Sequence, residues 1–233
     1  MRRGKGMELN SVIFDLDGVL VFSDEYHFRA WKKIADEMGI DFDHEKNNRL
    51  RGVSRMESLE IILEGYAGAP LGGEQKKKLA EQKNEIYRGL LMDMKPSDVS
   101  DNVRYTLEEL RRKGYKIALG SSSKNSRFIL ERVGLRDSFD AISDGTNIIH
   151  SKPDPEVFLK AAQLLGTRPE KCLVVEDSES GITAANAGGM KSAAIGDATK
   201  CKKATYCINR VSDIVGILGT EKWRHKFLLK QCR

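Results

Sequence analysis

Short runs of β-branched and aliphatic residues alternate along the chain with longer stretches whose apolar residues recur at helical spacing. Three of these runs end directly in a polar cluster, at residues 12–14, 117–119 and 173–175. Alternation of strands and helices is typical of βαβ units, in which helices join parallel strands. The pattern therefore predicts an α/β fold with a doubly wound parallel sheet.

Two helices of this α/β pattern have readable boundaries. Asp154 is the expected N-cap of one helix, with Pro155 at its first helical position and Gly166 at its end. A second helix is expected over residues 98–112, where Gly114 provides the stop signal.

A different pattern fills the region between the first strand and Pro96. Apolar residues recur at helical spacing through three successive segments, and no convincing strand interrupts them. Ser54 and Glu57 form a capping-box pattern ahead of the second segment. The sequence therefore predicts a helical cap domain at residues 22–95, inserted into an α/β catalytic core domain formed by residues 1–21 and 96–233.

Composition places the chain among ordinary globular proteins. Of its 233 residues, 40% are hydrophobic and 31% charged, and the net charge is +5. No apolar run approaches the roughly 18 residues of a membrane span, and neither a basic stripe nor an aromatic platform suggests nucleic acid. The four cysteines match no zinc pattern and are too sparse for a disulfide framework. We therefore expect a cytoplasmic protein that binds neither a membrane nor nucleic acid.

Two acids follow the first predicted strand. Asp15 and Asp17 are two residues apart, and Gly18 lets the chain turn sharply there. One carboxylate can accept a phosphoryl group as a nucleophile while the other acts as general acid and base. An Asx turn that closes the strand is the alternative explanation.

Two more acids follow a later strand, at Glu176 and Asp177. Four carboxylates near one point repel one another unless a cation lies between them, and ligands that offer only oxygen favour Mg²⁺. For Asp177 alone, an N-cap of the following helix is the alternative.

Two further segments can bind phosphate. Hydroxyl and backbone N–H groups gather at residues 121–125, where a strand leads into a helix. Lys152 stands next to a proline, and its ammonium can neutralise a phosphoryl group. Serine-rich loops and solvated lysines are also common without any such role.

The motifs together resemble a known family. The Asp-Leu-Asp-Gly of residues 15–18, the serine at 121, the Lys-Pro at 152–153 and the Glu-Asp at 176–177 have the order and approximate spacing found in the haloacid dehalogenase superfamily. Its members are mostly phosphatases and phosphomutases. The resemblance covers nearly the whole chain and implies a Rossmann-like core, and the helical insertion resembles the small mobile cap of the superfamily.

The resemblance also implies roles for individual residues. It implies Asp15 as the nucleophile, Asp17 as the acid and base, and Ser121 and Lys152 as contacts of the transferring phosphate. It implies Mg²⁺ held by Asp15, the Asp17 carbonyl, Glu176 and Asp177. The segments of the insertion resemble those of the superfamily's sugar phosphomutases, and the substrate-binding residues that follow are His27, Trp31, Gly52, Val53, Ser54, Arg55, Lys83, Ser122, Ser123, Lys124 and Asn125.

Without the resemblance, several of these residues have structural explanations. Arg55 and Lys83 fit solvated helix positions, Trp31 fits a core position, and His27 fits a polar position near the hinge.

The resemblance implies an activity. It is the interconversion of β-glucose 1-phosphate and β-glucose 6-phosphate through an aspartyl phosphate, with β-glucose 1,6-bisphosphate as the intermediate. A sugar-phosphate phosphatase shares the Asp15 chemistry and is the first alternative, and a non-catalytic binding protein is the second. We expect a monomer that acts on small sugar phosphates.

Overall fold

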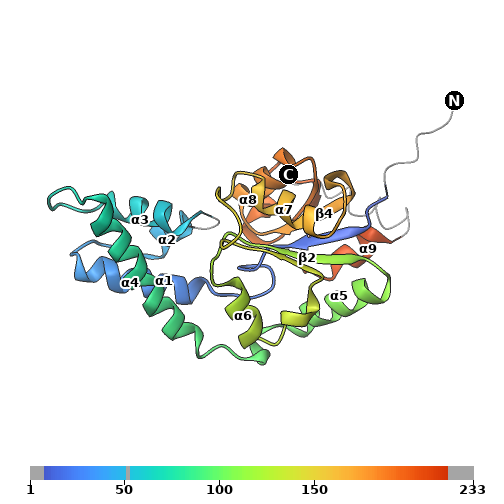
Figure 1. The fold of residues 1–233 in the computed structure, drawn as a ribbon, viewed down its shortest axis with the longest axis horizontal. Helices are drawn as coiled ribbons and strands as arrows, with labels where there is room; N and C mark the ends of the chain where they lie inside the picture. The colour runs from blue at the N-terminus through green and yellow to red at the C-terminus, as the bar shows by residue number, and fades with distance from the viewer. Residues whose placement is uncertain (1–7, 51–52, 220–233) are drawn as a thin grey trace.

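The computed structural model describes residues 8–50 and 53–219, and over these residues the chain forms a six-stranded parallel sheet with helices on both faces (Figure 1). The strands are β1 (Ser11–Phe14), β2 (Lys116–Gly120), β3 (Ala141–Ser143), β4 (Cys172–Glu176), β5 (Lys191–Ala194) and β6 (Tyr206–Cys207). Their order in the sheet is β3-β2-β1-β4-β5-β6, and each neighbouring pair is parallel. The predicted doubly wound α/β fold is confirmed.

Helices cover both faces because the central strands are apolar on both sides. The core helices are α5 (Asp101–Arg112), α6 (Ser126–Arg132), α7 (Glu156–Leu164), α8 (Glu179–Ala187) and α9 (Asp213–Leu218). Val12 and Phe14 of β1 belong to the apolar cluster that contains Leu107 of α5, whereas Ile13 belongs to the cluster that contains Phe158 of α7. Successive side chains of a strand point to opposite faces, so β1 is buried from both sides.

Both predicted helix starts need correction by a few residues. Over residues 96–98 the chain forms a 3-10 turn, and α5 begins only at Asp101, behind Ser100 as its N-cap. In α7 the N-cap is Pro155 instead of Asp154, whose side chain accepts a backbone N–H of the first turn. Proline and short polar side chains compete for these first positions, so the pattern locates a helix start only approximately.

The region after β1 is helical and lies beside the sheet (Figure 1). Its helices are α1 (Asp24–Glu37), α2 (His44–Asn48), α3 (Arg55–Leu63) and α4 (Gly73–Leu91). These helices bury an apolar cluster of their own around Trp31, Phe42 and Leu59. The predicted capping box is present, because Ser54 and Glu57 each accept the backbone N–H of the other.

The base of this helical region is packed into the core of the α/β unit. Tyr87 and Leu91 of α4, and Ala30 of α1, belong to the same apolar cluster as Leu20 and Val21, which follow β1. The helical region and the α/β unit therefore share part of one apolar core. The division of the chain into a core and a cap at residues 22 and 95 stays a prediction.

Candidate active site

The carboxyl ends of the central strands define the site. β1 lies between β2 and β4. From β1 the sheet extends through β2 to β3 on one side and through β4 and β5 to β6 on the other, so the strand order changes direction next to β1. In open α/β sheets, ligands bind at such a switch point. Asp15 directly follows β1, Ser121 follows β2, and Glu176 ends β4, so the fold brings three distant segments to one edge.

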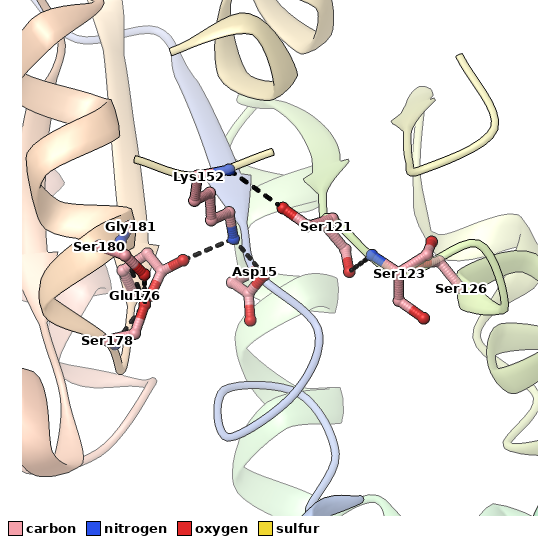
Figure 2. A network of polar contacts seen from close by, with 10 residues as sticks. Asp15, Ser121, Ser123, Ser126, Lys152, Glu176, Ser178, Ser180 and Gly181 are labelled. Carbon is pink, nitrogen blue, oxygen red and sulfur yellow. Dashed lines mark hydrogen bonds and ion pairs between the residues drawn. The ribbon is translucent and has the colours of Figure 1, made fainter. Parts of the chain in front are cut away.

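Lys152 is the centre of the buried charges at this edge. Its Nζ lies 2.5 Å from Oδ1 of Asp15 and 2.5 Å from Oε1 of Glu176 (Figure 2). The side chain is only 2% exposed, and its ammonium lies 4.8 Å from the ring centroid of Phe158. One buried ammonium therefore holds two carboxylates from neighbouring strands in fixed positions.

Glu176 is fixed on its other side by the loop that begins α8. Its Oε2 accepts the N–H and the hydroxyl of Ser178, each at 2.8 Å. Gly181 in the first turn of α8 leaves room for the carboxyl group, which a Cβ at that position would overlap. The position of Glu176 thus depends on a glycine that the sequence analysis did not identify.

Asp15, Glu176 and Asp177 fit a metal site. One carboxylate oxygen of each lies within 4.8 Å of the others. Burial raises the pKa of Asp15 to about 7, against the attraction of Lys152, and the charge of Glu176 adds to this rise. The three carboxylates carry more negative charge than the single ammonium of Lys152 can offset. Their ligand atoms are all oxygens, which suits a hard cation such as Mg²⁺. The coordination of the ion by the Asp17 carbonyl stays a prediction.

Asp17 lines the same cavity as Asp15, but its side chain has different neighbours. Its Oδ1 accepts the hydroxyl of Ser23, which therefore does not cap α1. Burial raises the pKa of Asp17 above its ordinary value, and the Ser23 hydrogen bond opposes that rise. A carboxyl group whose pKa is raised by burial is suited to donate a proton at neutral pH.

The loop after β2 is held in one conformation by hydrogen bonds of its own. The hydroxyl of Ser121 accepts the backbone N–H of Ser123 at 3.2 Å (Figure 2). The hydroxyl of Ser123 accepts the backbone N–H of Asn125, also at 3.2 Å. Gly145 of the loop after β3 donates its N–H to the Ser123 carbonyl, and a Cβ there would lie 2.9 Å from the nitrogen of Lys124. Two loops thus support one another, and this close approach requires glycine at position 145.

A buried lysine reaches the cavity from the helical region. Lys83 of α4 is 3% exposed, and its Nζ lies 2.9 Å from Nδ1 of His27 and 4.4 Å from the ring centroid of Tyr87. Burial lowers the pKa of Lys83 well below its ordinary value and does the same for His27, where the charge of Lys83 adds to the effect. Lys83 and His27 therefore form a buried pair whose uncharged forms are both favoured, and the solvated position considered for Lys83 is wrong.

One cavity of about 760 Å³ joins these groups. The predicted site residues that line it are Asp15, Asp17, His27, Trp31, Val53, Ser54, Arg55, Lys83, Ser121, Ser122, Ser123, Lys124, Asn125, Lys152 and Asp177. Glu176 lies buried beneath the cavity, and Gly52 lies outside the described residues. The lining therefore combines residues of the α/β unit with residues of the helical region.

Some lining residues were not identified from the sequence. Phe22 and Ile149 line the cavity although they are 75% and 86% exposed, and Lys77 and Glu81 line it from α4. Phe22 follows Val21 directly before the helical region begins, and this apolar pair is the one feature of the sequence that could have drawn attention to Phe22. Nothing in the local sequence marks Ile149, Lys77 or Glu81.

Comparison with known proteins identifies the class to which this fold and site belong. The chain matches the haloacid dehalogenase-like hydrolase family over residues 9–189, and it belongs to that family and is an enzyme.

Individual relatives narrow the comparison. The chain is 39% identical over 216 residues to a β-phosphoglucomutase of Bacillus subtilis, which covers 92% of this chain and 96% of the relative. It is 32% identical over 185 residues to a phosphorylated carbohydrates phosphatase of Thermotoga maritima, over 78% of this chain and 83% of the relative. A crystal structure of a β-phosphoglucomutase from Clostridium difficile superimposes with a TM-score of 0.83 and 34% identity, over 94% of this chain and 96% of the other.

Among the residues that the structure describes, no helix has the length and apolar character needed to cross a membrane.

Proposed function

We propose that this enzyme interconverts β-glucose 1-phosphate and β-glucose 6-phosphate through an aspartyl phosphate on Asp15. One observation carries the proposal. The cavity that exposes Asp15 and Asp17 also exposes Arg55, Lys124 and Asn125, a second group of cations and donors. A bisphosphate needs one such group for each of its phosphates, and the similarity to β-phosphoglucomutases supports this assignment.

In the proposed reaction Asp15 carries the phosphoryl group. A hydroxyl oxygen of the sugar phosphate attacks the phosphorus of the aspartyl phosphate, the bond from Asp15 to phosphorus breaks, and β-glucose 1,6-bisphosphate forms. After the bisphosphate turns end for end, the Asp15 carboxylate attacks its other phosphorus and releases the second sugar monophosphate. Lys152 contacts Asp15, and its charge offsets the negative charge that develops on the phosphoryl oxygens.

Asp17 serves both half-reactions in this proposal. It takes the proton of the attacking hydroxyl in one direction and returns a proton to the leaving sugar oxygen in the other. The burial that raises its pKa makes the protonated form accessible near neutral pH. The hydroxyl of Ser23 donates to the carboxyl group of Asp17 and holds it in place.

We further propose that Asp15 and Asp177, with Glu176 behind them, hold Mg²⁺. When bound, the ion supplies positive charge to the transferring phosphoryl group and offsets the repulsion among the three carboxylates. Ser121, which follows the neighbouring strand β2, contacts the same phosphoryl group through its hydroxyl.

The helical region is the element that separates mutase from phosphatase chemistry. Arg55, Lys83 and His27 belong to it, and they face the same cavity as Asp15. We propose that residues 22–95 act as a cap that closes over the substrate, so that a sugar hydroxyl and not water reaches the aspartyl phosphate.

The deciding experiment is product analysis. The pure protein is mixed with β-glucose 1-phosphate, Mg²⁺ and a trace of β-glucose 1,6-bisphosphate, and phosphorus NMR follows the products. We expect glucose 6-phosphate to form faster than inorganic phosphate. Faster release of inorganic phosphate would replace this function with that of a sugar-phosphate phosphatase, and the absence of any phosphoenzyme would leave a binding protein.

An Arg55→Ala variant sharpens the experiment. Isomerisation should be lost, whereas phosphorylation of Asp15 by acetyl phosphate should persist, because that small donor needs only the groups around Lys152. Equal loss of both reactions would show that Arg55 supports the fold instead of the second phosphate.

We also propose that the enzyme acts as a monomer in the cytoplasm on free sugar phosphates. Sugar phosphates are charged and do not cross a membrane unaided, so they are available where they are made. Light scattering of the pure protein measures the assembly state.

A further inference from the structure

The proposed site for the non-transferring phosphate rests on one side chain that does not line the cavity. Arg55 and Asn125 line the cavity, and the amide oxygen of Asn84 lies behind both of them. Nη2 of Arg55 donates to Oδ1 of Asn84 at 2.7 Å, and Nδ2 of Asn125 donates to the same oxygen at 2.9 Å. A single acceptor therefore fixes the two donors relative to each other.

These three residues come from three separate elements. Arg55 begins α3, Asn84 lies in the middle of α4, and Asn125 is the N-cap of α6 in the α/β unit. The hydrogen bond between Asn125 and Asn84 thus joins the helical region to the core. Asn125 also has its Oδ1 3.5 Å from Nη1 of Arg88, which lies one helical turn after Asn84.

The neutrality of the acceptor is as important as its position. A carboxylate would hold Arg55 equally well, but it would also neutralise the guanidinium that a phosphate must find. An amide oxygen supplies the hydrogen bonds and leaves the charge available. Arg55 is half-buried, so its guanidinium already lacks part of its hydration. This burial lowers the pKa of Arg55, and the charge of Glu81 opposes that shift. A partly desolvated cation binds an incoming anion more strongly than a solvated one.

We propose that Asn84 is a positioning residue for substrate, a neutral anchor that holds Arg55 and Asn125 at the spacing that the non-transferring phosphate requires. This inference rests on the proposed function, because it assigns Arg55 and Asn125 to that phosphate. Asn84 acts through these two residues and does not touch the sugar phosphate itself.

The test measures the affinity of the unphosphorylated full-length protein for glucose 6-phosphate by titration calorimetry, with glucose as the ligand that lacks a phosphate. Asn84→Ala removes the shared acceptor and should weaken glucose 6-phosphate binding about tenfold, the loss expected for one or two organising hydrogen bonds. Asn84→Asp keeps both hydrogen bonds and adds a charge, and it should weaken binding by about tenfold or more. Gln82→Ala is the matched control, since Gln82 is an amide of the same helix whose side chain donates to Glu37 within the helical region.

Two readouts separate positioning from a general effect on the fold. The KM for β-glucose 1-phosphate should rise in both Asn84 variants, while the rate of Asp15 phosphorylation by acetyl phosphate stays within about twofold of wild type. In an Arg55→Ala background, Asn84→Ala should cost clearly less than it does alone, because the residue through which it acts is already absent.

Three results would overturn the inference. They are Asn84→Asp binding like wild type, Asn84→Ala binding like Gln82→Ala, and an Asn84→Ala effect that is unchanged in the Arg55→Ala background. The proposed function fails separately: a wild-type protein that binds glucose 6-phosphate but only hydrolyses β-glucose 1-phosphate would end that proposal and leave the role of Asn84 in phosphate binding intact.

Discussion

Replacement of Gly181 by alanine should damage the charge network although the substitution favours the helix in which it lies. Alanine is preferred over glycine in a helix by about 1 kcal/mol. Against this gain, the added Cβ would overlap the carboxyl group of Glu176, which is 1% exposed and cannot retreat into solvent. The carboxyl group must therefore leave its position between Lys152 and Ser178.

The cost follows from the bonds that are lost. Hydrogen bonds to charged groups contribute about 1.5–3 kcal/mol each, and Glu176 accepts three of them, from Lys152 and from the N–H and hydroxyl of Ser178. Loss of two bonds, less the gain in helix propensity, gives a net destabilisation of about 2–5 kcal/mol. Lys152 then holds Asp15 alone, so phosphorylation of Asp15 should slow as well.

The assay is urea unfolding followed by circular dichroism, together with the rate of Asp15 phosphorylation by acetyl phosphate. Gly188→Ala at the end of the same helix is the control, because a Cβ there has its nearest neighbours at 3.4 Å. In a Glu176→Asp background the shorter side chain makes room, so Gly181→Ala should cost less there. An unfolding midpoint equal to that of Gly188→Ala, with phosphorylation at the wild-type rate, would refute the reasoning.

Three further predictions concern the chemistry and its pH dependence. Asp15→Asn should abolish the phosphoenzyme seen by mass spectrometry, whereas Asp17→Asn should lower turnover by roughly 10²–10⁴-fold and leave the phosphorylated residue unchanged; a phosphoryl group on another residue would contradict the assignment. A chelator should remove activity and Mg²⁺ restore it, and Asp177→Ala should raise the Mg²⁺ concentration needed for half-maximal activity; full activity in excess chelator would exclude a metal. The folded protein holds the pKa of His27 below its usual value of about 6.5, so the unfolded chain binds the extra proton and the contribution of His27 to stability falls as the pH drops below about 6.5. The raised pKa values of Asp15 and Asp17 act in the opposite direction, so the contribution of His27 is measured as a difference between two variants. Lys83→Met removes one cause of the lowered pKa of His27. Between pH 7 and pH 5 the unfolding midpoint of this variant should therefore change less unfavourably than that of wild type. An equal change in both proteins would contradict the coupling of Lys83 to His27.

Some strands could not be predicted from the sequence. β1, β2 and β4 were recognised because they are continuous apolar runs, as expected for strands buried on both faces. β3, β5 and β6 have three, four and two residues, and β5 is made largely of small side chains. Runs this short do not show the alternation of apolar and polar residues by which a strand is recognised in a sequence. They become strands because neighbouring strands offer them hydrogen bonds.

The sequence by itself determined the order of the chemistry along the chain. It placed carboxylates after two apolar runs, serines after a third and a lysine beside a proline, and the capping box of Ser54 and Glu57 fixed where α3 begins. These features depend on neighbours within a few residues, so local pattern is enough to recognise them.

Tertiary structure alone decided which of these groups meet and what surrounds them. Lys83 lies in a highly charged helix, yet packing against Trp31 and Tyr87 buries it beside His27. The contact of Gly181 with Glu176 and the bond of Asn84 to Asn125 likewise join different elements of the fold. Burial and electrostatic coupling depend on distance in space, and separation along the chain does not predict that distance until the sheet order and helix packing are known.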